Sequence, residues 1–275
     1  MISKDILPSE ALREFIYQYR LRHFVFKNGV VPAAKPFPPR PEQCLTFYVR
    51  GSETAWYVKN KEELKKPRCV ISGQFTSRVD RFVSYPETLI IFVDFKPGAL
   101  NRITGIPFTE FTDKDVDAET VFPPEIKRVN DRLNSTSCYH EMIRIVEDFV
   151  SNLVQRSKNM ILPFDHMLML TAQDHEYTID SLARKAYLSP RQLERKFYER
   201  IGISPKTFLR ISRFNRSYWM HLKNPNLTWF QIAMACGYTD YQHLVKEYKT
   251  FANAKPNHFF IEESQAPGRM LGLTK

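Results

Sequence analysis

The chain has 275 residues, of which 43% are hydrophobic, and a formal net charge of +10. This length suits two domains of ordinary size, and the apolar content, with 21 phenylalanines, excludes a disordered chain. No apolar run approaches the roughly 18 residues that a membrane-spanning helix needs, and residues 1–10 lack a signal pattern, so we expect a cytoplasmic protein. The four cysteines are far apart and are expected to be free thiols.

The N-terminal part of the chain is predicted to be mostly β structure. The continuous apolar run from Ile90 to Val93 is typical of a strand that is covered on both faces. Prolines and the pair Pro97-Gly98 separate the candidate strands. Several short strands between turns predict a barrel or a sandwich. The candidate strands are 17–27, 43–51, 68–72 and 88–96.

Helical periodicity begins after Pro123. Apolar residues three and four positions apart predict one helix around 126–133 and a second around 142–153. The stretch 156–164 is polar and basic and contains a proline near its end, so we expect a linker there. The first domain is therefore predicted to span 1–155, with its helices after its strands.

The same helix–turn–helix pattern occurs twice in the second half of the chain. The offset between the copies is 50 residues through Tyr238 and 51 from Leu244 onward, so one residue is inserted after the turn. A helix from about Asp165 is expected before the first copy, and a long helix from Pro205 to Leu222 is expected to join the two copies. The repeated apolar positions are Leu182, Ala183, Ala186, Leu188, Leu193 and Phe197, then Ile232, Ala233, Cys236, Tyr238, Leu244 and Tyr248.

The ends of these helices carry recognisable signals. Ser189, Thr228 and Thr239 are each followed three residues later by Gln, which is the spacing of a capping box. Gly202 and Asn253 follow the second helix of each copy and suit the left-handed conformation that ends a helix. A fixed helix start matters for DNA recognition because side chains of the first turns must meet base edges.

The window 184–216 contains ten basic and only two acidic residues, which favours a polyanionic partner. Side chains on the exposed faces of the second helices are the candidates for base contacts: Arg191, Glu194, Arg195, Tyr241, Gln242, His243 and Lys246. Candidates for phosphate contacts are Ser189, Lys196, Arg200, Lys206, Arg210, Thr239 and Lys249.

The residue patterns of common enzymes and metal sites are missing from the sequence. The seven histidines lie singly, and there is no glycine-rich phosphate loop and no nucleophile elbow. The acidic stretch from Asp113 to Glu119 lacks the glycine turn of a calcium loop, so we expect a solvated acidic loop. We therefore expect no catalytic residues, no metal and no cofactor.

Residues 166–261 resemble the DNA-binding domain of the AraC/XylS family of bacterial transcription regulators. The segments that carry the resemblance are 179–183, 188–197, 202–205, 232–233 and 237–238. It implies an all-α domain over 165–262, with two helix–turn–helix units joined by a long helix, and a flexible tail over 263–275. It also implies that the β-rich domain is a cupin-like barrel that senses an effector or mediates dimerisation.

The resemblance further implies the partners of the protein. These are double-stranded DNA, RNA polymerase, a small-molecule effector and a second copy of the chain, with a location at the nucleoid. No effector-binding residue can be carried over. Two alternatives stay open: a β domain that acts as an enzyme or small-molecule binding protein with an appended basic interaction module, and basic helices that bind acidic protein surfaces.

Overall fold

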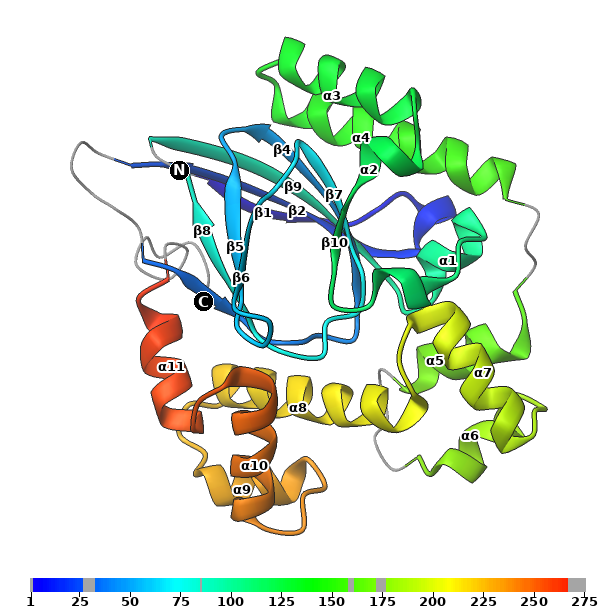
Figure 1. Ribbon diagram of the computed structural model, residues 1–275, viewed down its shortest axis with the longest axis vertical. Helices are drawn as coiled ribbons and strands as arrows, with labels where there is room; N and C mark the ends of the chain where they lie inside the picture. Colours follow the sequence, from blue (N-terminus) through cyan, green and yellow to red (C-terminus); the bar gives the residue numbers. More distant parts are fainter. Residues whose placement is uncertain (1, 27–32, 85, 158–160, 172–176, 267–275) are drawn as a thin grey trace.

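A computed structural model describes residues 2–26, 33–84, 86–157, 161–171 and 177–266 (Figure 1). The described part of the chain forms a β-rich N-terminal region followed by a helical C-terminal region, which confirms the predicted α+β fold class. The two regions have separate hydrophobic cores, one built from residues between Leu12 and Val150 and the other from residues between Phe164 and Phe259. The domain bounds 1–155, 156–164 and 165–262 themselves stay predictions.

The β region consists of two antiparallel sheets. The six-stranded sheet has the order β1 (Ile2–Ile6), β2 (Ile16–Val25), β9 (Glu87–Phe95), β4 (Gln43–Arg50), β7 (Cys69–Ser72) and β10 (Asp115–Asp117). The four-stranded sheet has the order β3 (Lys35–Phe37), β8 (Val79–Val83), β5 (Glu53–Tyr57) and β6 (Glu62–Lys65). The two sheets face each other as in a barrel (Figure 1).

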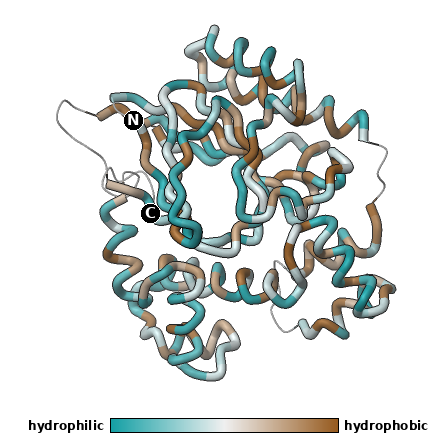
Figure 2. The backbone as a smooth tube through the Cα atoms, in the orientation of Figure 1, coloured by the Kyte–Doolittle hydropathy of each residue, from teal (hydrophilic) through white to brown (hydrophobic). Residues whose placement is uncertain are grey.

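Strand β9 is covered on both faces, as its apolar run predicted. Because successive side chains of a strand point to opposite faces, Leu89, Ile91 and Val93 enter the main core of the region. Ile90 and Phe92 point to the other side, between the two sheets. In Figure 2 hydrophobic segments of the backbone tube, in brown, occur along the strands of the large sheet and alternate with hydrophilic segments, in teal, in the surrounding helices.

Helices cover the outer face of the large sheet (Figure 1). The two predicted helices are α3 (Glu125–Ser135) and α4 (Tyr139–Arg156), and their apolar residues join the same core as β9. The short elements before them were not predicted: α1 (Ala99–Thr104), α2 (Ala118–Val121) and the 3-10 turns η1 (Glu10–Leu12) and η2 (Phe108–Phe111).

The C-terminal region contains the two expected helix–turn–helix units. The first is α6 (Ile179–Lys185) with α7 (Pro190–Ile201), and the second is α9 (Trp229–Ala235) with α10 (Tyr241–Ala252). The long helix α8 (Pro205–Lys223) joins them, as the sequence predicted. Helix α5 (Pro163–Thr171) precedes the units, and α11 (Pro256–Ser264) follows them.

Parts of the expected linker and tail, residues 158–160 and 267–275, lie outside the described residues. Of the rest of the expected tail, Glu263 and Ala266 are buried, so the packed structure extends beyond residue 262. All four cysteines are free, as expected. None of the helices in the described ranges combines the length and hydrophobicity that crossing a membrane requires.

Candidate nucleic-acid interface

Helix α7 is fixed at both ends by its own sequence. The Gln192 backbone N–H donates to Ser189 Oγ at 3.3 Å, and the Ser189 N–H donates to Gln192 Oε1 at 2.8 Å, which is the predicted capping box. Gly202 ends the helix with a φ of 92°, where a side chain would be strained. The start of the helix, and so the direction of its first side chains, is therefore set locally.

Helix α10 begins one residue later than the proposed capping box. The cap is Asp240, whose carboxylate accepts from the His243 N–H at 2.7 Å, whereas the Thr239 hydroxyl contacts His243 Nδ1 at 3.2 Å. The prediction of a Thr239–Gln242 box is therefore wrong. An ionised Asp is a strong acceptor for a helix N-terminus, and this residue lies at the 51-residue offset from Ser189.

The position of this cap shows which residues of α7 and α10 are equivalent. At the 51-residue offset Gln242 corresponds to Arg191, and Lys246 corresponds to Arg195. Asn253 ends α10 with a φ of 53°, in the conformation that the sequence predicted. The box of Thr228 and Gln231 at the start of α9 is also confirmed.

The predicted base-contact residues differ in how freely they face solvent. Arg191, Glu194 and Arg195 are exposed on α7, and Gln242 and Lys246 are exposed on α10. The remaining two are half-buried: Tyr241 packs against the helical core, and His243 contacts the ring of Tyr238. The exposed set gives the two units different surfaces, with two guanidinium groups and a carboxylate on one and an amide and an ammonium group on the other.

Four of the seven predicted phosphate-contact residues are exposed: Ser189, Lys206, Thr239 and Lys249. Lys196 is half-buried and pairs with Glu199 at 3.1 Å. Arg210 pairs with Glu247 at 3.0 Å. These two cations remain at the surface, although each already has a carboxylate partner.

Arg200 differs from the expectation of a phosphate contact. Its side chain faces the core side of α7 and is only 7% exposed, with Asp165 of α5 at 3.9 Å. It follows Phe197 by three positions on the helix, so it shares the inward face with that buried ring. Arg200 is therefore not part of the candidate interface.

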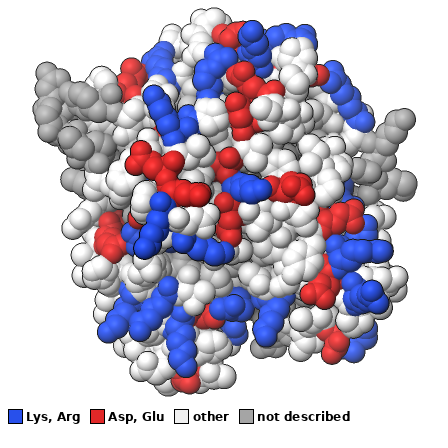
Figure 3. All heavy atoms as spheres, in the orientation of Figure 1, with Lys and Arg blue, Asp and Glu red and all other residues white. Residues whose placement is uncertain are grey.

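A groove of about 900 Å³ lies between the two units. It is lined by residues of α6, α8 and α10, among them Lys206, Arg210 and Arg213. Sequence reasoning did not assign Arg213, although it belongs to the basic window; its guanidinium lies 4.8 Å from the Tyr238 ring and donates to the Gly237 carbonyl at 3.2 Å. Lys and Arg side chains gather over the lower part of the face in Figure 3, where α8 to α10 lie.

The N-terminal region contacts the C-terminal ends of both second helices, which the sequence did not predict. At α7, Gln43 Nε2 donates to the Arg200 carbonyl at 3.1 Å, and Thr112 Oγ1 donates to the Gly202 carbonyl at 2.7 Å. At α10, Arg78 donates from Nη1 to the Ala252 carbonyl at 3.1 Å. The last carbonyls of a helix have no partner within it, so these donors are favourable there.

The acidic stretch after Asp113 is structural, and the expectation of a solvated loop is wrong. Asp113 accepts from the Thr76 N–H at 2.6 Å, Asp115 is buried against Lys66 at 3.1 Å, and Asp117 caps α2. Within the described ranges, no group of three or more His, Cys, Asp or Glu side chains is arranged to bind a metal ion. Burial raises the pKa of the Cys236 thiol to about 11.

A second candidate site lies between the two sheets. It is a cavity of about 570 Å³ lined by residues of β2, β3, β5, β8 and β9. A neighbouring cavity of about 340 Å³ shares Arg20, Phe37 and Arg81 with it.

Comparison with protein families gives two matches. Residues 182–260 match a helix-turn-helix domain, and residues 4–117 match a domain of unknown function, DUF6597. No curated protein matches the chain.

Comparison with solved structures gives matches over most of the chain and shorter matches. ToxT from Vibrio cholerae is 8% identical with a TM-score of 0.50, over 89% of this chain and 98% of that protein, and it shares the fold. A transcriptional regulator with an AraC-type DNA-binding domain from Chromobacterium violaceum is 26% identical over 38% of this chain and 93% of its own, with a TM-score of 0.35. The DNA-binding domain of AdpA, a global transcriptional factor solved in complex with a target DNA, is 18% identical over 38% of this chain and 95% of its own, also with a TM-score of 0.35.

Proposed function

We propose that the chain, whose residues 182–260 match a helix-turn-helix domain, is a transcription regulator of the AraC/XylS family and binds a specific, non-palindromic DNA sequence. Each second helix enters the major groove in one of two adjacent segments of the same duplex. Because the two helices present different side chains, the two halves of the site have different sequences.

One observation carries this proposal: α7 and α10 start from defined caps and present different polar side chains at equivalent positions. Arg191 and Arg195 are suited to the O6 and N7 atoms of guanine, and Glu194 is suited to the amino group of cytosine. On α10, Gln242 is suited to adenine, and Lys246 to guanine or phosphate. Tyr241 and His243 lie beside these positions and complete the second surface.

Phosphate contacts position the protein on the duplex without reading its sequence. We assign this role to Ser189, Lys196, Lys206, Arg210, Thr239 and Lys249. Lys206 and Arg210 line the groove between the units, where a DNA backbone that connects the two major-groove segments would pass. Binding is therefore strongly salt-dependent, because each neutralised phosphate releases counterions.

The N-terminal region is proposed to control this binding, through a small-molecule effector or through dimerisation. Its contacts with the ends of α7 and α10 supply a route by which a change in the β region alters the position of the DNA-reading helices. The protein then acts at the nucleoid in the cytoplasm and communicates with RNA polymerase.

Selection of bound sequences from random DNA duplexes, with the full chain, tests the proposed function. We expect one asymmetric motif. Arg191→Ala relaxes the preference at one or two adjacent base pairs, while Lys206→Ala weakens binding to all sequences alike. Arg128→Ala, on the exposed face of α3, is the control and leaves both motif and affinity unchanged. The proposal fails if no motif is enriched or if Arg191→Ala leaves the motif intact.

A further inference from the structure

The two helix–turn–helix units have turns with the same backbone structure. In the first turn the Leu188 N–H donates to the Ala183 carbonyl at 2.9 Å, and in the second the Tyr238 N–H donates to the Ala233 carbonyl at 3.0 Å. This bond, which closes the last turn of the preceding helix around a left-handed residue, defines a Schellman motif. The two turns can therefore be compared side chain by side chain, and a difference between them is not required by the fold.

The left-handed residue of the motif differs between the two turns. It is Gly237 in the second unit, with a φ of 74°, and Tyr187 in the first, with a φ of 55°. Glycine is favoured at such a position because it has no Cβ atom to be strained. Tyr187 is also 86% exposed, so its ring is not packed into the protein in return. A strained residue with an exposed aromatic ring indicates a contact outside the chain.

Two basic residues precede this tyrosine. Arg184 and Lys185 are exposed in the last turn of α6, and at the 50-residue offset the second unit has Met234 and Ala235. The helix dipole favours cations in the last turn of a helix. The second unit nevertheless forms the same helix end without them, so the two charges are not needed for the turn.

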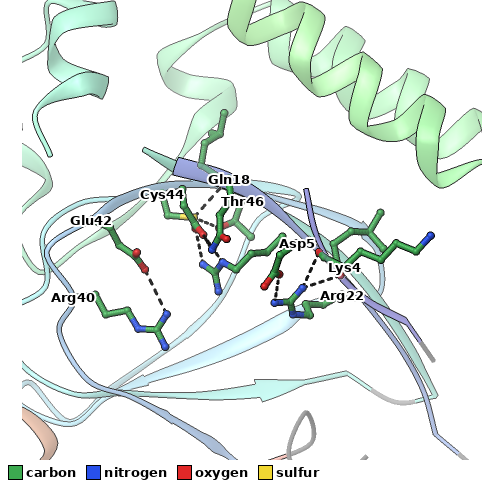
Figure 4. Close-up of polar contacts among 12 residues, drawn as sticks. Lys4, Asp5, Gln18, Arg22, Arg40, Glu42, Cys44 and Thr46 are labelled. Carbon is green, nitrogen blue, oxygen red and sulfur yellow. Dashed lines mark hydrogen bonds and ion pairs between the residues drawn. The ribbon is translucent and has the colours of Figure 1, made fainter. Parts of the chain in front are cut away.

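The charges of this turn are not neutralised within the described part of the chain. Several basic side chains of the β region have a carboxylate partner, and Figure 4 shows one such pair, Arg22 with Asp5 at 2.6 Å. None of the described residues forms an ion pair with Arg184 or Lys185. The one carboxylate of α6, Asp180, lies in the first turn of the helix, away from this end. The turn therefore presents positive charge that an anionic partner can neutralise.

The turn leads directly into the proposed DNA-reading helix. Ser189, the cap of α7, follows Tyr187 by two residues, and Arg191 follows Ser189 by two. No acidic residue lies in the first turn of α7, and the N-terminus of a helix carries a partial positive charge. A guanidinium, an ammonium group and a phenol hydroxyl beside this helix start are groups that proteins use to contact phosphate oxygens.

The opposite end of α6 lies at the groove between the units. Thr178 and Ile179, at the start of the helix, line this groove together with Lys206 and Arg210. The seven residues of α6 span ~10 Å, which is close to the ~12 Å width of the major groove. The two ends of α6 can therefore contact the phosphate strands on either side of the groove that α7 is proposed to enter.

We propose that the turn of the first unit is a phosphate-binding site for the DNA backbone. The Tyr187 hydroxyl donates to one phosphate, and Arg184 and Lys185 neutralise phosphates beside it. The turn of the second unit, with Met234 and Gly237 at equivalent positions, makes no such contact, so the first unit is the stronger anchor on the duplex. The proposal rests on the proposed function, because it requires α7 to enter the major groove.

Exchanging the turn residues tests the proposal. Arg184→Met, Lys185→Ala and Tyr187→Gly in one chain give the first turn the residues of the second, whose backbone is the same. Fluorescence anisotropy with the full chain and a labelled mixed-sequence duplex of about 30 base pairs measures affinity at several salt concentrations. We expect the exchange to lower affinity by about tenfold or more, and to reduce the slope of log affinity against log salt concentration by about 2, one for each lost cation.

A matched control removes the same charge elsewhere. Lys127→Ala with Arg128→Met changes two exposed residues of α3, which lies across the β region from the helical units (Figure 1). We expect this variant to keep both the affinity and the salt dependence of the parent protein. The comparison separates a local phosphate contact from an effect of net charge.

Two single substitutions test the tyrosine. Tyr187→Phe removes only the hydroxyl and should lower affinity by about three- to tenfold, with little change in salt dependence. Tyr187→Gly should also lower affinity, although urea denaturation should show no loss of stability, because it relieves the left-handed backbone. A residue with a purely structural role would not combine these two results.

The proposal is overturned if the exchanged turn binds DNA like the parent protein, if the α3 control acts like the exchange, or if Tyr187→Phe retains full affinity. Unchanged DNA binding would assign the basic turn to an acidic protein surface instead. Tyr187→Phe keeps the ring and the backbone, so it decides the question even if the exchanged turn does not fold. The mixed-sequence duplex requires no motif, so this test can succeed when duplex selection fails, and the reverse.

Discussion

Gln43, the first residue of β4, donates a hydrogen bond from its side-chain amide to the backbone carbonyl of Arg200 in the last turn of α7, at 3.1 Å. The amide is buried, so water cannot replace it at this carbonyl. The C-terminal end of α7 is thus tied to the large sheet, while the opposite end of the helix carries Arg191. The β region therefore contacts α7 away from the end that we propose reads DNA.

Removing this contact should loosen the attachment of the two regions. We expect Gln43→Ala to lower the free energy of unfolding by ~1–2 kcal/mol, because the Arg200 carbonyl loses a buried partner. Chemical denaturation measures the change. Gln155→Ala, at an exposed position of α4, is the control and should lie within about 0.5 kcal/mol of the parent protein. Equal effects of the two substitutions would show that the contact has no energetic role.

The cap of α10 gives a second prediction. Asp240→Ala should destabilise the helical region by ~1 kcal/mol, because the His243 N–H loses its acceptor, and Thr239→Ala should cost less. Thermal unfolding followed by circular dichroism compares the two variants. Because α10 starts at this cap, Asp240→Ala should also weaken DNA binding. A larger effect of Thr239→Ala would show that Thr239, and not Asp240, caps the helix, as the sequence predicted.

The turn between α6 and α7 contains a strained residue. Tyr187 has a φ of 55° and is 86% exposed, whereas the equivalent position of the second unit is Gly237 with a φ of 74°. A left-handed backbone conformation destabilises a non-glycine residue by ~1–2 kcal/mol. Replacement by glycine relieves this strain, but the greater conformational freedom of glycine in the unfolded chain offsets part of the gain. We expect Tyr187→Gly to stabilise the protein by ~0.5 kcal/mol in urea denaturation, whereas a loss of stability would show that the backbone of Tyr187 is not strained.

Lys35 makes the stability of the protein depend on pH. Burial and the charges of Arg40, Arg20 and Arg81 lower its pKa to about 7, against the opposing charge of Glu263. Arg22 and Glu53 also line the cavity into which it faces. The unfolded chain therefore holds this proton up to a higher pH than the folded chain, so the Lys35 contribution to stability rises with pH above about 7.

Replacing Lys35 by an uncharged residue should remove this pH dependence. We expect Lys35→Met to raise the free energy of unfolding at pH 6, where the buried ammonium group is charged, and to have a smaller effect at pH 8.5. Urea denaturation at the two pH values measures the change, and Lys65→Met, which removes an exposed lysine of β6, is the control. An unchanged pH profile in Lys35→Met would assign the effect to another group.

The helical region could be predicted closely because its signals are local. Apolar residues at helical spacing and caps such as Ser189 determine each element within a few neighbouring residues. The start of α10 was misplaced by one residue because the Thr-to-Gln spacing was preferred to the single carboxylate of Asp240. The offset between the two copies indicates Asp240 as the cap, because Asp240 lies 51 residues after Ser189, just as Leu244 lies 51 residues after Leu193.

The β region could be predicted only in part. The strands β2, β4, β7 and β9 of the large sheet were anticipated, because apolar residues dominate their buried positions. The strands of the small sheet were not, since β3 has only three residues, including Pro36, and every residue of β6 is exposed. The pairing of Lys35 with Arg81 depends on the sheet register, and no pattern of neighbouring residues reveals it.

In the proposed function, α7 and α10 read the two halves of a DNA site independently, through equivalent positions. Duplex selection with Gln242→Arg tests this, because the substitution places on α10 the side chain that α7 carries at Arg191. We expect one adenine preference to change to guanine in one half of the motif, while the half read by α7 keeps its sequence. An unchanged motif, or the same change in both halves, would show that the two helices do not read separate halves of the site.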